Sequence, residues 1–288
     1  MVIAVASGKG GTGKTMVAVS LALAVSEEKT GLRPLLLDCD VEEPNAGLFL
    51  DPDYSLQRET GVLVPEVDDD RCTYCGLCAE VCVWNAIAVA GSKTLVFRDM
   101  CHGCASCMLV CPENAISEIL HVTGKIEGGT ALSLDFARGV MNIGQAMPVP
   151  TISSLLKEYL SQEREGLVII DAPPGTSCPV VEAVGRSDYV ILVTEPTPFG
   201  LHDLKAAVDV VVNQLGIRAG VIINRDGIGD MKVEEYCNSE NLPILARIPM
   251  DRKIAEVLSE GTPLIHGYPE YGKVFLDILG RIRKEISP

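Results

Sequence analysis

The chain is short of positive charge. Its 288 residues include 24 lysines and arginines against 39 aspartates and glutamates, which gives a formal net charge of −15. A negative field of this size repels nucleic acids and anionic lipids unless a local basic patch overcomes it. The sequence contains no such patch. We therefore expect no nucleic-acid partner.

Apolar runs long enough to span a membrane are also absent. No charged, apolar and small-residue leader opens the sequence, which favours a cytoplasmic location. The C-terminal stretch places one apolar stripe on a helix, formed by Val274, Phe275, Ile278, Leu279, Ile282 and Ile286. Such a stripe can lie on a membrane surface, but it is more typical of a terminal helix packed on the core. Membrane association is therefore not expected.

Histidine is scarce, and the four histidines are scattered. No Ser-His-Asp or Cys-His set is recognisable, so the sequence offers no nucleophilic triad. It offers instead 47% hydrophobic residues, enough for the core of one large domain or two smaller ones, and eleven cysteines. Eight of these cysteines have metal-ligand spacing, which argues against a disulfide framework.

The frame of the chain alternates apolar runs with helical stretches. The runs cover residues 2–6, 35–38, 167–171, 189–193 and 219–224, and the helical stretches lie around 16–25, 151–165, 200–215 and 252–260. Continuous apolar strands of this kind suit a parallel sheet that is buried on both faces. The pattern predicts a doubly wound α/β domain with a mostly parallel sheet.

A cysteine-rich stretch interrupts this alternation at about residues 63–118. Its first four cysteines recur 29 residues later, so that Cys72, Cys75, Cys78 and Cys82 correspond to Cys101, Cys104, Cys107 and Cys111. The pair Ala86-Ile87 likewise recurs as Ala115-Ile116. A hairpin predicted near residues 128–136 returns the chain to the larger domain. We expect a discontinuous domain, residues 1–62 and 119–288, with an inserted small domain at 63–118.

Residues 8–15 read GKGGTGKT, between a predicted strand and a predicted helix. This is the P-loop pattern, in which backbone N–H groups and the helix N-terminus surround phosphate oxygens. Lys14 is expected to reach the β- and γ-phosphates and Thr15 to supply a hydroxyl to Mg²⁺. The loop before them consists of Gly8, Lys9, Gly10, Gly11, Thr12 and Gly13.

The early lysine, Lys9, gives the loop a second feature. A KGG-x-GK-[ST] loop resembles the deviant Walker A motif of the MinD/ParA family, which also includes the nitrogenase iron protein and cluster carriers. In that family the early lysine crosses a dimer interface to the partner's nucleotide. The resemblance implies an ATP-bound homodimer, whereas an ordinary solvated loop lysine is the simpler alternative.

The same resemblance implies roles for further residues. Asp38 and Asp40 match the acidic residues of the first switch, with Asp40 expected to orient the attacking water, and Asn45 matches the switch asparagine. Asp171 resembles the Walker B acid that holds Mg²⁺ through water. The remaining matches are Gly175 in the second switch, and Asn224, Pro249 and Asp251 on the adenine side.

The inserted stretch contains two Cys-x2-Cys-x2-Cys motifs, each with a fourth cysteine nearby. A [4Fe-4S] cluster takes four thiolates, and such a loop supplies three of them. Zinc is the competing interpretation, although zinc sites favour two Cys-x2-Cys pairs over three cysteines plus one. The insert resembles bacterial dicluster ferredoxins, small α+β domains in which the distant cysteine of each motif completes the other cluster.

The ferredoxin resemblance implies two ligand sets. One set is Cys72, Cys75, Cys78 and Cys111, and the other is Cys101, Cys104, Cys107 and Cys82. The second motif keeps the family's proline after its last cysteine, Pro112, whereas Val83 replaces it in the first. Of the three remaining cysteines, Cys39 and Cys237 are expected to be packing residues. For Cys178 we favour a structural role over a shared intersubunit cluster.

Together these resemblances imply a Mg²⁺-dependent ATPase with two [4Fe-4S] clusters, in which the nucleotide state controls electron transfer to a redox or regulatory protein partner. Two other classes of function remain open. One is an iron-sulfur cluster assembly or carrier factor, and the other is a positioning or regulatory switch whose clusters sense redox state.

Overall fold

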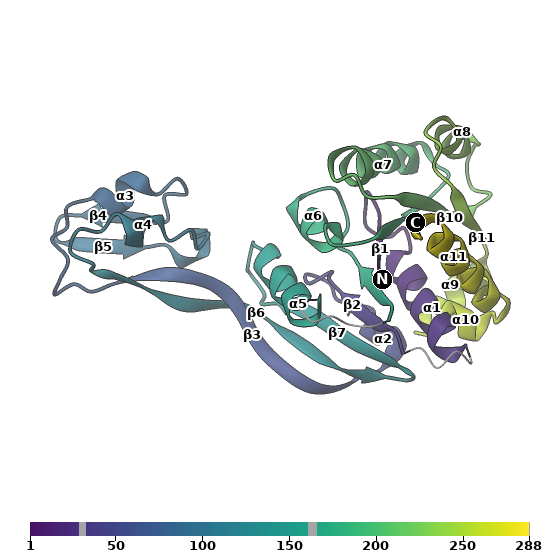
Figure 1. The fold of residues 1–288 in the computed structure, drawn as a ribbon, viewed down its shortest axis with the longest axis horizontal. Coiled ribbons are helices and arrows are strands. Elements are labelled where there is room, and N and C mark those ends of the chain that lie inside the picture. The colour runs from purple at the N-terminus through teal and green to yellow at the C-terminus, as the bar shows by residue number, and fades with distance from the viewer. Residues whose placement is uncertain (29–32, 161–165, 288) are drawn as a thin grey trace.

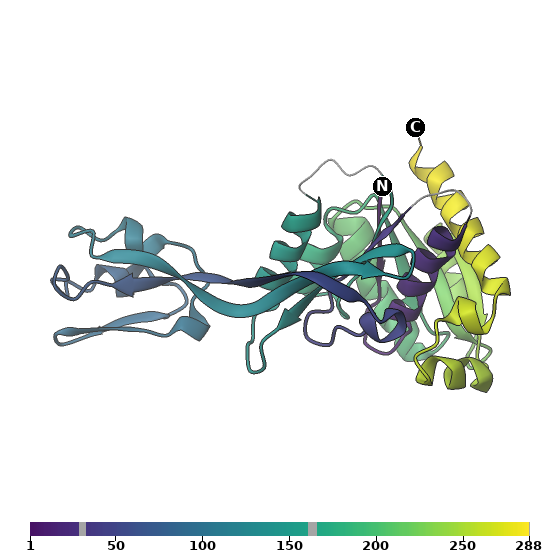
Figure 2. The ribbon, with the colours of Figure 1, turned by 90° about the horizontal axis from the view of Figure 1, so that it is seen from below.

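The computed structural model of the chain describes residues 1–28, 33–160 and 166–287. It consists of a helix-covered sheet domain and a small cysteine-bearing module, joined by a long two-stranded ribbon (Figure 1). The module lies at the far end of this ribbon, well away from both chain termini (Figures 1 and 2).

The parallel part of the main sheet is built from the apolar runs. Within the described residues this sheet has nine strands in the order β11-β10-β9-β1-β8-β2-β7-β6-β3. Its first six strands are β11 Ile244–Pro249, β10 Ala219–Asp226, β9 Tyr189–Thr194, β1 Val2–Ala6, β8 Val168–Asp171 and β2 Leu35–Asp38. All neighbouring pairs among these six are parallel, which confirms the mostly parallel α/β prediction. The sequence patterns had not predicted β11.

The other edge of the sheet is antiparallel and extends into the ribbon. β7 Leu134–Met141 pairs in parallel with β2, and β6 Ile116–Ala131 pairs antiparallel with β7, which confirms the predicted hairpin. β3 Asp53–Val67 then pairs antiparallel with β6 along nearly its whole length. The ribbon therefore runs through both expected domain boundaries, residues 63 and 118, before the module begins.

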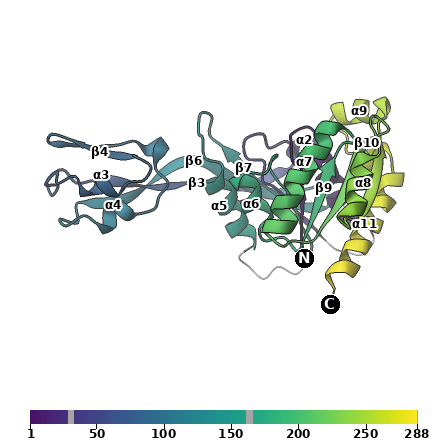
Figure 3. The ribbon, with the colours of Figure 1, turned by 90° about the horizontal axis from the view of Figure 1, so that it is seen from above.

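Two layers of helices cover the sheet, one on each face (Figures 2 and 3). On one face, the core includes side chains of α1 Lys14–Glu27, α9 Arg252–Ser259, α10 Leu264–Gly267 and α11 Glu270–Ile286. On the other face, it includes side chains of α5 Val149–Leu160, α6 Cys178–Val184, α7 Pro198–Val208 and α8 Lys232–Ser239. This arrangement confirms the doubly wound prediction.

The predicted helices are present with shifted ends. The stretch predicted at 200–215 divides into α7 and a π-helical segment, Asp209–Gln214. Of the stretch predicted at 151–165, α5 accounts for the part up to residue 160, and residues 161–165 lie outside the described residues. A short helix, α2 Gly47–Leu50, follows the predicted switch residue Asn45.

The C-terminal helix α11 packs on the sheet domain, as its apolar stripe predicted. Phe275, Ile278, Leu279 and Ile282 are all buried, in the same core as α1. In the parts of the chain that the structure describes, no helix combines the length and the apolarity needed to cross a membrane.

The module preserves the 29-residue repeat in three dimensions. It contains α3 Leu77–Val81, the hairpin of β4 Ile87–Ala90 and β5 Lys93–Val96, a 3₁₀ turn at Arg98–Met100, and α4 Ser106–Leu109. The residues that precede the two α-helices, Gly76 and Ala105, both have left-handed backbone conformations. Ala86, Ile87 and their repeats, Ala115 and Ile116, are all buried. The duplication is therefore structural as well as sequential.

Candidate functional site

The P-loop leads from the end of β1 into α1, and close packing requires its glycines. A Cβ atom on Gly8 would lie 2.2 Å from the carbonyl oxygen of Asp203 in α7. A Cβ atom on Gly13, whose φ is +96°, would lie 2.5 Å from Asn224 Nδ2 at the end of β10. By contrast, Gly10 and Gly11 have open space beside them. The loop is thus held against its neighbours on two sides while the middle of the loop stays accessible.

Two buried carboxylates lie side by side at the carboxyl edge of the sheet. Asp38 and Asp171 end neighbouring strands in matched register, and both have a relative exposure of 0%. The amide N–H groups of Asp40 and Ala46 donate to Asp38, at 3.2 and 3.0 Å. Neither carboxylate oxygen of Asp171 has a hydrogen-bond partner among the described residues, although the nearby Thr15 hydroxyl lowers the pKa of Asp171.

Burial and mutual repulsion shift the acidity of this group. Burial raises the pKa of Asp171 to about 7, against the opposing effects of the Thr15 hydroxyl and the Lys14 ammonium. Burial and the charge of Asp171 raise the pKa of Asp38 well above its usual range. Burial also raises the pKa of Asp40, while Lys14 opposes that rise. The site is therefore rich in carboxylates that would be stabilised by a cation.

Several predicted site residues have buried polar atoms without partners. Among the described residues, the side-chain oxygens of Thr12, Asn45 and Asp171 are buried and accept or donate no hydrogen bond. Such groups are costly to bury and are usually satisfied by a ligand, an ion or water. Lys14 is also buried. Thr12 and Lys14 belong to the P-loop, and Asp171 lies close to Lys14 and Thr15, so these groups fit a phosphate group with a hydrated Mg²⁺.

The second predicted switch lies against the P-loop. Gly175 has a φ of +98°, and its amide N–H donates to the carbonyl oxygen of Ser7 at 3.0 Å. A hydrogen bond therefore links the loop after β8 directly to the residue that precedes Gly8. A change at the phosphate position can reach this loop through one backbone contact.

The predicted adenine-side residues line one cavity next to the P-loop. Asn224 donates from Nδ2 to the carbonyl oxygen of Thr12 at 2.7 Å, so it also fixes the loop. The Asp251 carboxylate caps α9 by accepting from the Lys253 amide at 2.9 Å. The cavity lining includes Gly13, Met16, Asn224, Arg225, Pro249, Met250, Asp251 and Ile254.

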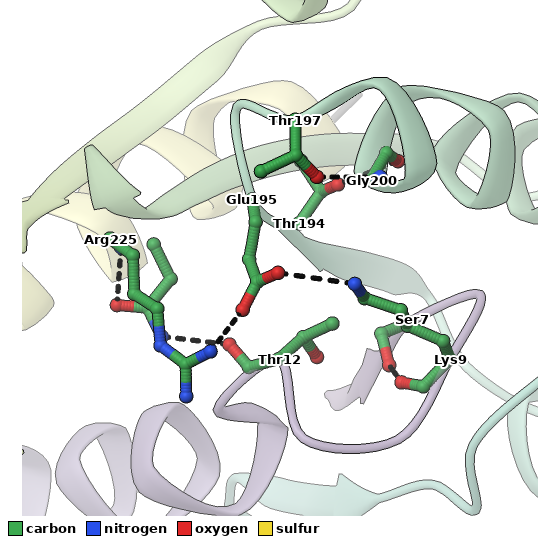
Figure 4. Close-up of polar contacts among 9 residues, drawn as sticks. Ser7, Lys9, Thr12, Thr194, Glu195, Thr197, Gly200 and Arg225 are labelled. Atoms are coloured by element: carbon green, nitrogen blue, oxygen red, sulfur yellow. Dashed lines mark hydrogen bonds and ion pairs between the residues drawn. The ribbon is translucent and has the colours of Figure 1, made fainter. Parts of the chain in front are cut away.

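Lys9 does not extend freely into solvent. Its Nζ lies 3.1 Å from Oε2 of Glu195, which follows β9. Arg225 Nη1 donates to the other oxygen of the same carboxylate, so that Glu195 lies between two cations (Figure 4). Lys9 therefore has a carboxylate partner within its own chain while about a third of its side chain stays exposed, at 34%.

The eight cysteines of the module form two groups around two cavities. One cavity is lined by Cys72, Cys75, Cys78 and Cys111. The other is lined by Cys82, Cys101, Cys104 and Cys107. Each group thus combines three thiols of one motif with the fourth thiol of the other motif.

Backbone N–H groups point at several of these sulfur atoms. The amides of Ala86 and Ala115 donate to Cys82 and Cys111, both at 3.3 Å, and the Gly103 amide donates to Cys101 at 3.5 Å. Within the described residues, no three His, Cys, Asp or Glu side chains converge closely enough to hold a single metal ion. The thiols instead surround their cavities, as a multi-iron cluster with one thiolate on each iron requires.

One thiol in each group is exposed, and the two exposed thiols, Cys75 and Cys104, are repeat equivalents. Hydrogen bonding with the side chain and backbone of Ser106 lowers the pKa of Cys104. Burial raises the pKa of Cys78 and of Cys107. Each group therefore has one edge toward solvent and at least one thiol in the interior of the module.

A further cavity lies between the module and the sheet domain. Its lining combines Glu42 of the first switch region, Ser177 and Cys178 at the start of α6, and Trp84 and His102 of the module. The Trp84 and His102 rings stack with their centroids 3.6 Å apart, and both rings also line the cavity of the second cysteine group. The stacked pair therefore separates this cysteine group from the switch residues.

Among the remaining cysteines, Cys39 and Cys237 are buried as expected for packing residues. The side chain of Cys178 is exposed at the start of α6, and the structural role favoured for it stays a prediction. Sequence reasoning missed Glu195, Arg225, Trp84 and His102. Of these four, Glu195 had a recognisable sequence signal, because it directly follows a buried apolar strand. Asp38 and Asp171 are placed similarly, as the last residues of their strands.

Comparison with known proteins places this geometry in a family. A model of the family described as the CobQ/CobB/MinD/ParA nucleotide binding domain matches residues 3–264. An uncharacterized protein of Methanocaldococcus jannaschii is 32% identical over 267 residues, covering 91% of this chain and 90% of that protein.

Two more distant similarities are informative. An iron-sulfur cluster carrier protein of Aquifex aeolicus is 27% identical over 296 residues, covering 96% of this chain and 65% of that protein. The solved structure of the septum site-determining protein MinD from Pyrococcus horikoshii, complexed with Mg-ADP, has a TM-score of 0.58 at 22% identity, covering 98% of this chain and 95% of that chain. At that identity the likeness shows the fold alone.

Proposed function

This chain belongs to the CobQ/CobB/MinD/ParA nucleotide-binding family, and we propose that it is an ATPase whose nucleotide state controls electron transfer through two [4Fe-4S] clusters. The observation that carries the proposal is the division of eight thiols into two groups of four, each around its own cavity, in a chain that also has a P-loop. Neither feature alone would join nucleotide and electron chemistry.

The residues around the P-loop would bind Mg²⁺-ATP. Lys14 and the loop amides would hold the phosphates, Thr15 would contact Mg²⁺, and Asp171 would hold it through water. Mg²⁺ supplies neutralisation of the charge that develops on the phosphates. Asp38 would complete the acidic environment of the metal. The unsatisfied oxygens of Thr12, Asn45 and Asp171 support this assignment, because each then gains a partner.

Asp40 would orient the water that attacks the γ-phosphate. It is partly exposed, whereas Asp38 and Asp171 are fully buried. Burial raises its pKa and Lys14 lowers it, so the carboxylate senses the same cation that holds the phosphates. Gly175, through its hydrogen bond to Ser7, would report the presence of the γ-phosphate to the loop before α6.

The two thiol groups fit [4Fe-4S] clusters in number, position and second-sphere contacts. Four thiols surround each cavity, and backbone N–H groups donate to three of the sulfur atoms. A bound cluster supplies a one-electron redox couple. The exposed edges at Cys75 and Cys104 give a protein partner access to either group.

The cavity between the module and the sheet domain gives the coupling a physical path. Glu42 follows Asp40 closely in the chain, Cys178 begins α6 just after Gly175, and Trp84 and His102 border the second thiol group. Met147, from the segment before α5, packs against the small core of Val62, Val64, Ala86 and Cys101. Movement of the switch loops would therefore change the surroundings of one group directly.

The proposed assembly is a homodimer in which Lys9 reaches the nucleotide of the partner subunit. Its support is the family match together with the position of Lys9 at the open face of the loop, beside Gly10 and Gly11. We predict that Lys9→Ala abolishes ATP-dependent dimerisation and keeps monomeric nucleotide binding. Light scattering that detects unchanged dimers would overturn this assignment.

Cluster delivery is the second candidate function. The relatives named as iron-sulfur cluster carriers favour it, as does the exposure of one thiol in each group, which would admit an acceptor. A buried thiol in each half of the repeat, Cys78 and Cys101, favours retained clusters instead. A redox-sensing positioning or regulatory ATPase is supported by the fold likeness alone.

One experiment separates these functions. The protein is reduced anaerobically with its clusters loaded, and two rates are measured with Mg²⁺-ATP and with Mg²⁺-ADP: electron transfer to an oxidised low-potential ferredoxin, and iron transfer to an apo-ferredoxin. Asp40→Ala, which should bind ATP without hydrolysing it, is the matched variant. Gating predicts a nucleotide-dependent electron rate with no iron lost. Nucleotide-dependent iron transfer would identify a carrier, and no response in either rate would contradict both.

A further inference from the structure

Glu195 is a buried carboxylate that no part of the proposed phosphate chemistry uses. Its side chain is 8% exposed, and it contacts Lys9 through Oε2 and Arg225 through Oε1. The two cations are much more accessible, with side-chain exposures of 34% for Lys9 and 47% for Arg225. Glu195 is therefore the fixed member of a three-residue group, and the cations are the members that can move.

The backbone around Glu195 is held firmly. The Thr197 amide donates to the Glu195 carbonyl oxygen at 2.8 Å, and the Thr197 hydroxyl accepts from the Gly200 amide at 3.0 Å, which caps α7. The Thr194 hydroxyl donates to the Gly200 carbonyl oxygen at 2.9 Å. Figure 4 shows this frame behind the carboxylate. Since β9 and α7 fix the position of Glu195, the ion pair with Glu195 orients Lys9 within its own subunit.

From this geometry we propose that Glu195 is a positioning residue that holds Lys9 in the single subunit and releases it when the ATP-bound dimer forms. The inference rests on the proposed role of Lys9 in the partner's site. A lysine paired with its own Glu195 is not available to a partner's phosphates. The strength of the pair therefore sets how much ATP is needed for dimerisation.

Arg225 makes the release of Lys9 feasible. Removing the only partner of a buried carboxylate leaves an uncompensated buried charge, which is strongly unfavourable. Because Arg225 occupies the second oxygen, Glu195 keeps one cation after Lys9 leaves. In the proposed dimer, Lys9 therefore leaves Glu195 and Arg225 remains paired with it.

Arg225 also connects this group to the adenine side of the site. It lines the adenine-side cavity together with Asn224, and its amide donates to Asn224 Oδ1 at 2.9 Å. Asn224 in turn holds the carbonyl oxygen of Thr12. A nucleotide in the cavity would lie beside the guanidinium group, so nucleotide binding and the hold on Lys9 are linked through one side chain.

The test compares variants that weaken or strengthen the hold on Lys9. The full chain, with clusters loaded, is titrated anaerobically with Mg²⁺-ATP, and the ATP concentration at half-maximal dimerisation is measured by analytical ultracentrifugation. Glu195→Gln keeps the shape and loses the charge, so we expect this concentration to fall by about threefold or more. Glu195→Asp, which is too short to reach Lys9, should shift it in the same direction.

Arg225→Met should shift the ATP concentration the opposite way, by about threefold upward, because Lys9 would then be the only cation left on Glu195. Arg225→Lys should restore a value near that of the unchanged protein. Since Arg225 lines the adenine-side cavity, ATP affinity is measured separately with each substitution combined with Lys9→Ala, and the dimerisation values are corrected for it.

Opposite shifts for Glu195→Gln and Arg225→Met support the inference, since a purely structural role would weaken the dimer in both. Shifts in the same direction, or no shift beyond the correction, would overturn it. If Lys9→Ala dimerises like the unchanged protein, the proposed role of Lys9 fails instead. The failure of the inference and the failure of the proposed function therefore give different results.

Discussion

The sheet domain and the cysteine module have interiors of different composition. The sheet domain has two extensive cores, one on each face, built from aliphatic side chains such as Ile3, Leu36 and Leu192. The module has two small clusters, and cysteines are members of both: Cys101 packs with Val62, Val64 and Ala86, and Cys78 packs with Ile87 and Ile116. Buried apolar area stabilises the first region, whereas so small a core usually requires metal or another crosslink.

This contrast assigns the two regions different tasks. The sheet domain places the predicted site residues Asp38 and Asp171 at the ends of neighbouring buried strands. The module includes several of its predicted ligand cysteines, such as Cys78 and Cys101, in its own small cores. Loss of a ligand from the nucleotide site should leave the fold intact, and loss of a cluster should unfold the module.

The largest expected effect comes from breaking the module alone. Cys78→Ser removes a buried ligand of the first group, so we expect iron per chain to fall to about half of the full content for two cubane clusters and the module to lose protection against proteolysis. Nucleotide binding by the sheet domain should persist. Iron analysis and limited proteolysis measure both effects.

The exposed Cys178 supplies the matched control, because Cys178→Ser should keep the full iron content. Equal iron in Cys78→Ser and Cys178→Ser would show that Cys78 is not a ligand. Simultaneous loss of nucleotide binding in Cys78→Ser would show that the two regions do not fold independently.

The second prediction concerns the buried carboxylates of the sheet domain. Burial raises the folded-state pKa of Asp171 to about 7, above the unfolded value near 4. The folded state therefore binds the proton more tightly than the unfolded state. The resulting contribution to the free energy of unfolding is complete below about pH 4 and is lost as the pH rises through about 7. Without nucleotide, the free energy of unfolding of the sheet domain should fall by about 1–3 kcal/mol between pH 5 and pH 8.

Asp171→Asn should flatten this pH dependence, because the amide carries no charge to bury. It should also abolish ATP hydrolysis, because it removes the carboxylate proposed to hold Mg²⁺ through water. Urea unfolding of the cluster-loaded protein, followed by far-UV circular dichroism at both pH values, measures the change. Asp277→Asn is the control, since Asp277 is exposed on α11. A pH slope that survives in Asp171→Asn would assign the titration to another group, with Asp38 the first to examine.

The third prediction addresses the connection between the two regions. Trp84→Ala removes the ring that stacks on His102 beside the second thiol group. We expect it to reduce the ATP-dependent change in electron-transfer rate by about half or more and to leave ATP hydrolysis and iron content unchanged. Trp84→Phe should retain part of the effect, and an unchanged response in Trp84→Ala would exclude this path.

The smallest expected effect compares the two halves of the repeat. Ala105 adopts a left-handed conformation, with φ +59°, at the position equivalent to Gly76. Ala105→Gly should stabilise the module by up to about 1 kcal/mol, and Gly76→Ala should destabilise it by a similar amount. No described residue other than its chain neighbours has an atom within 4 Å of a Cβ atom placed on Gly76, so backbone strain dominates the expected effect. Hydrogen exchange of the module measures both changes, and shifts of equal sign would contradict the equivalence.

Much of the sheet domain could be predicted from the sequence because its strands are continuous apolar runs. The segments that became β1, β2, β9 and β10 are buried almost throughout, and the P-loop pattern marks the turn from β1 to α1. The ribbon could not be predicted in this way. β3 alternates exposed and partly buried residues over most of its length and contains Pro65, so it lacks the apolar run that reveals a buried strand.

Contacts between distant residues were also beyond the sequence patterns. Lys9 and Glu195 lie 186 residues apart, and the stacking of Trp84 on His102 depends on how the two halves of the repeat fold together. The ligand spacing of the cysteines is local and therefore readable from sequence. The assignment of the cysteines to two sets of four came from the resemblance to ferredoxins. In the structure, the same two sets line two separate cavities.

The most direct test of the account is the midpoint potential of the clusters in the two nucleotide states. Anaerobic redox titration followed by EPR spectroscopy would be carried out on the full chain with Mg²⁺-ADP and, for the ATP state, on Asp40→Ala with Mg²⁺-ATP, with each variant also titrated without nucleotide. We predict two clusters per chain and a different potential for at least one of them between the states. Two clusters with identical potentials in all states, together with an unchanged electron-transfer rate, would contradict coupling between nucleotide and clusters.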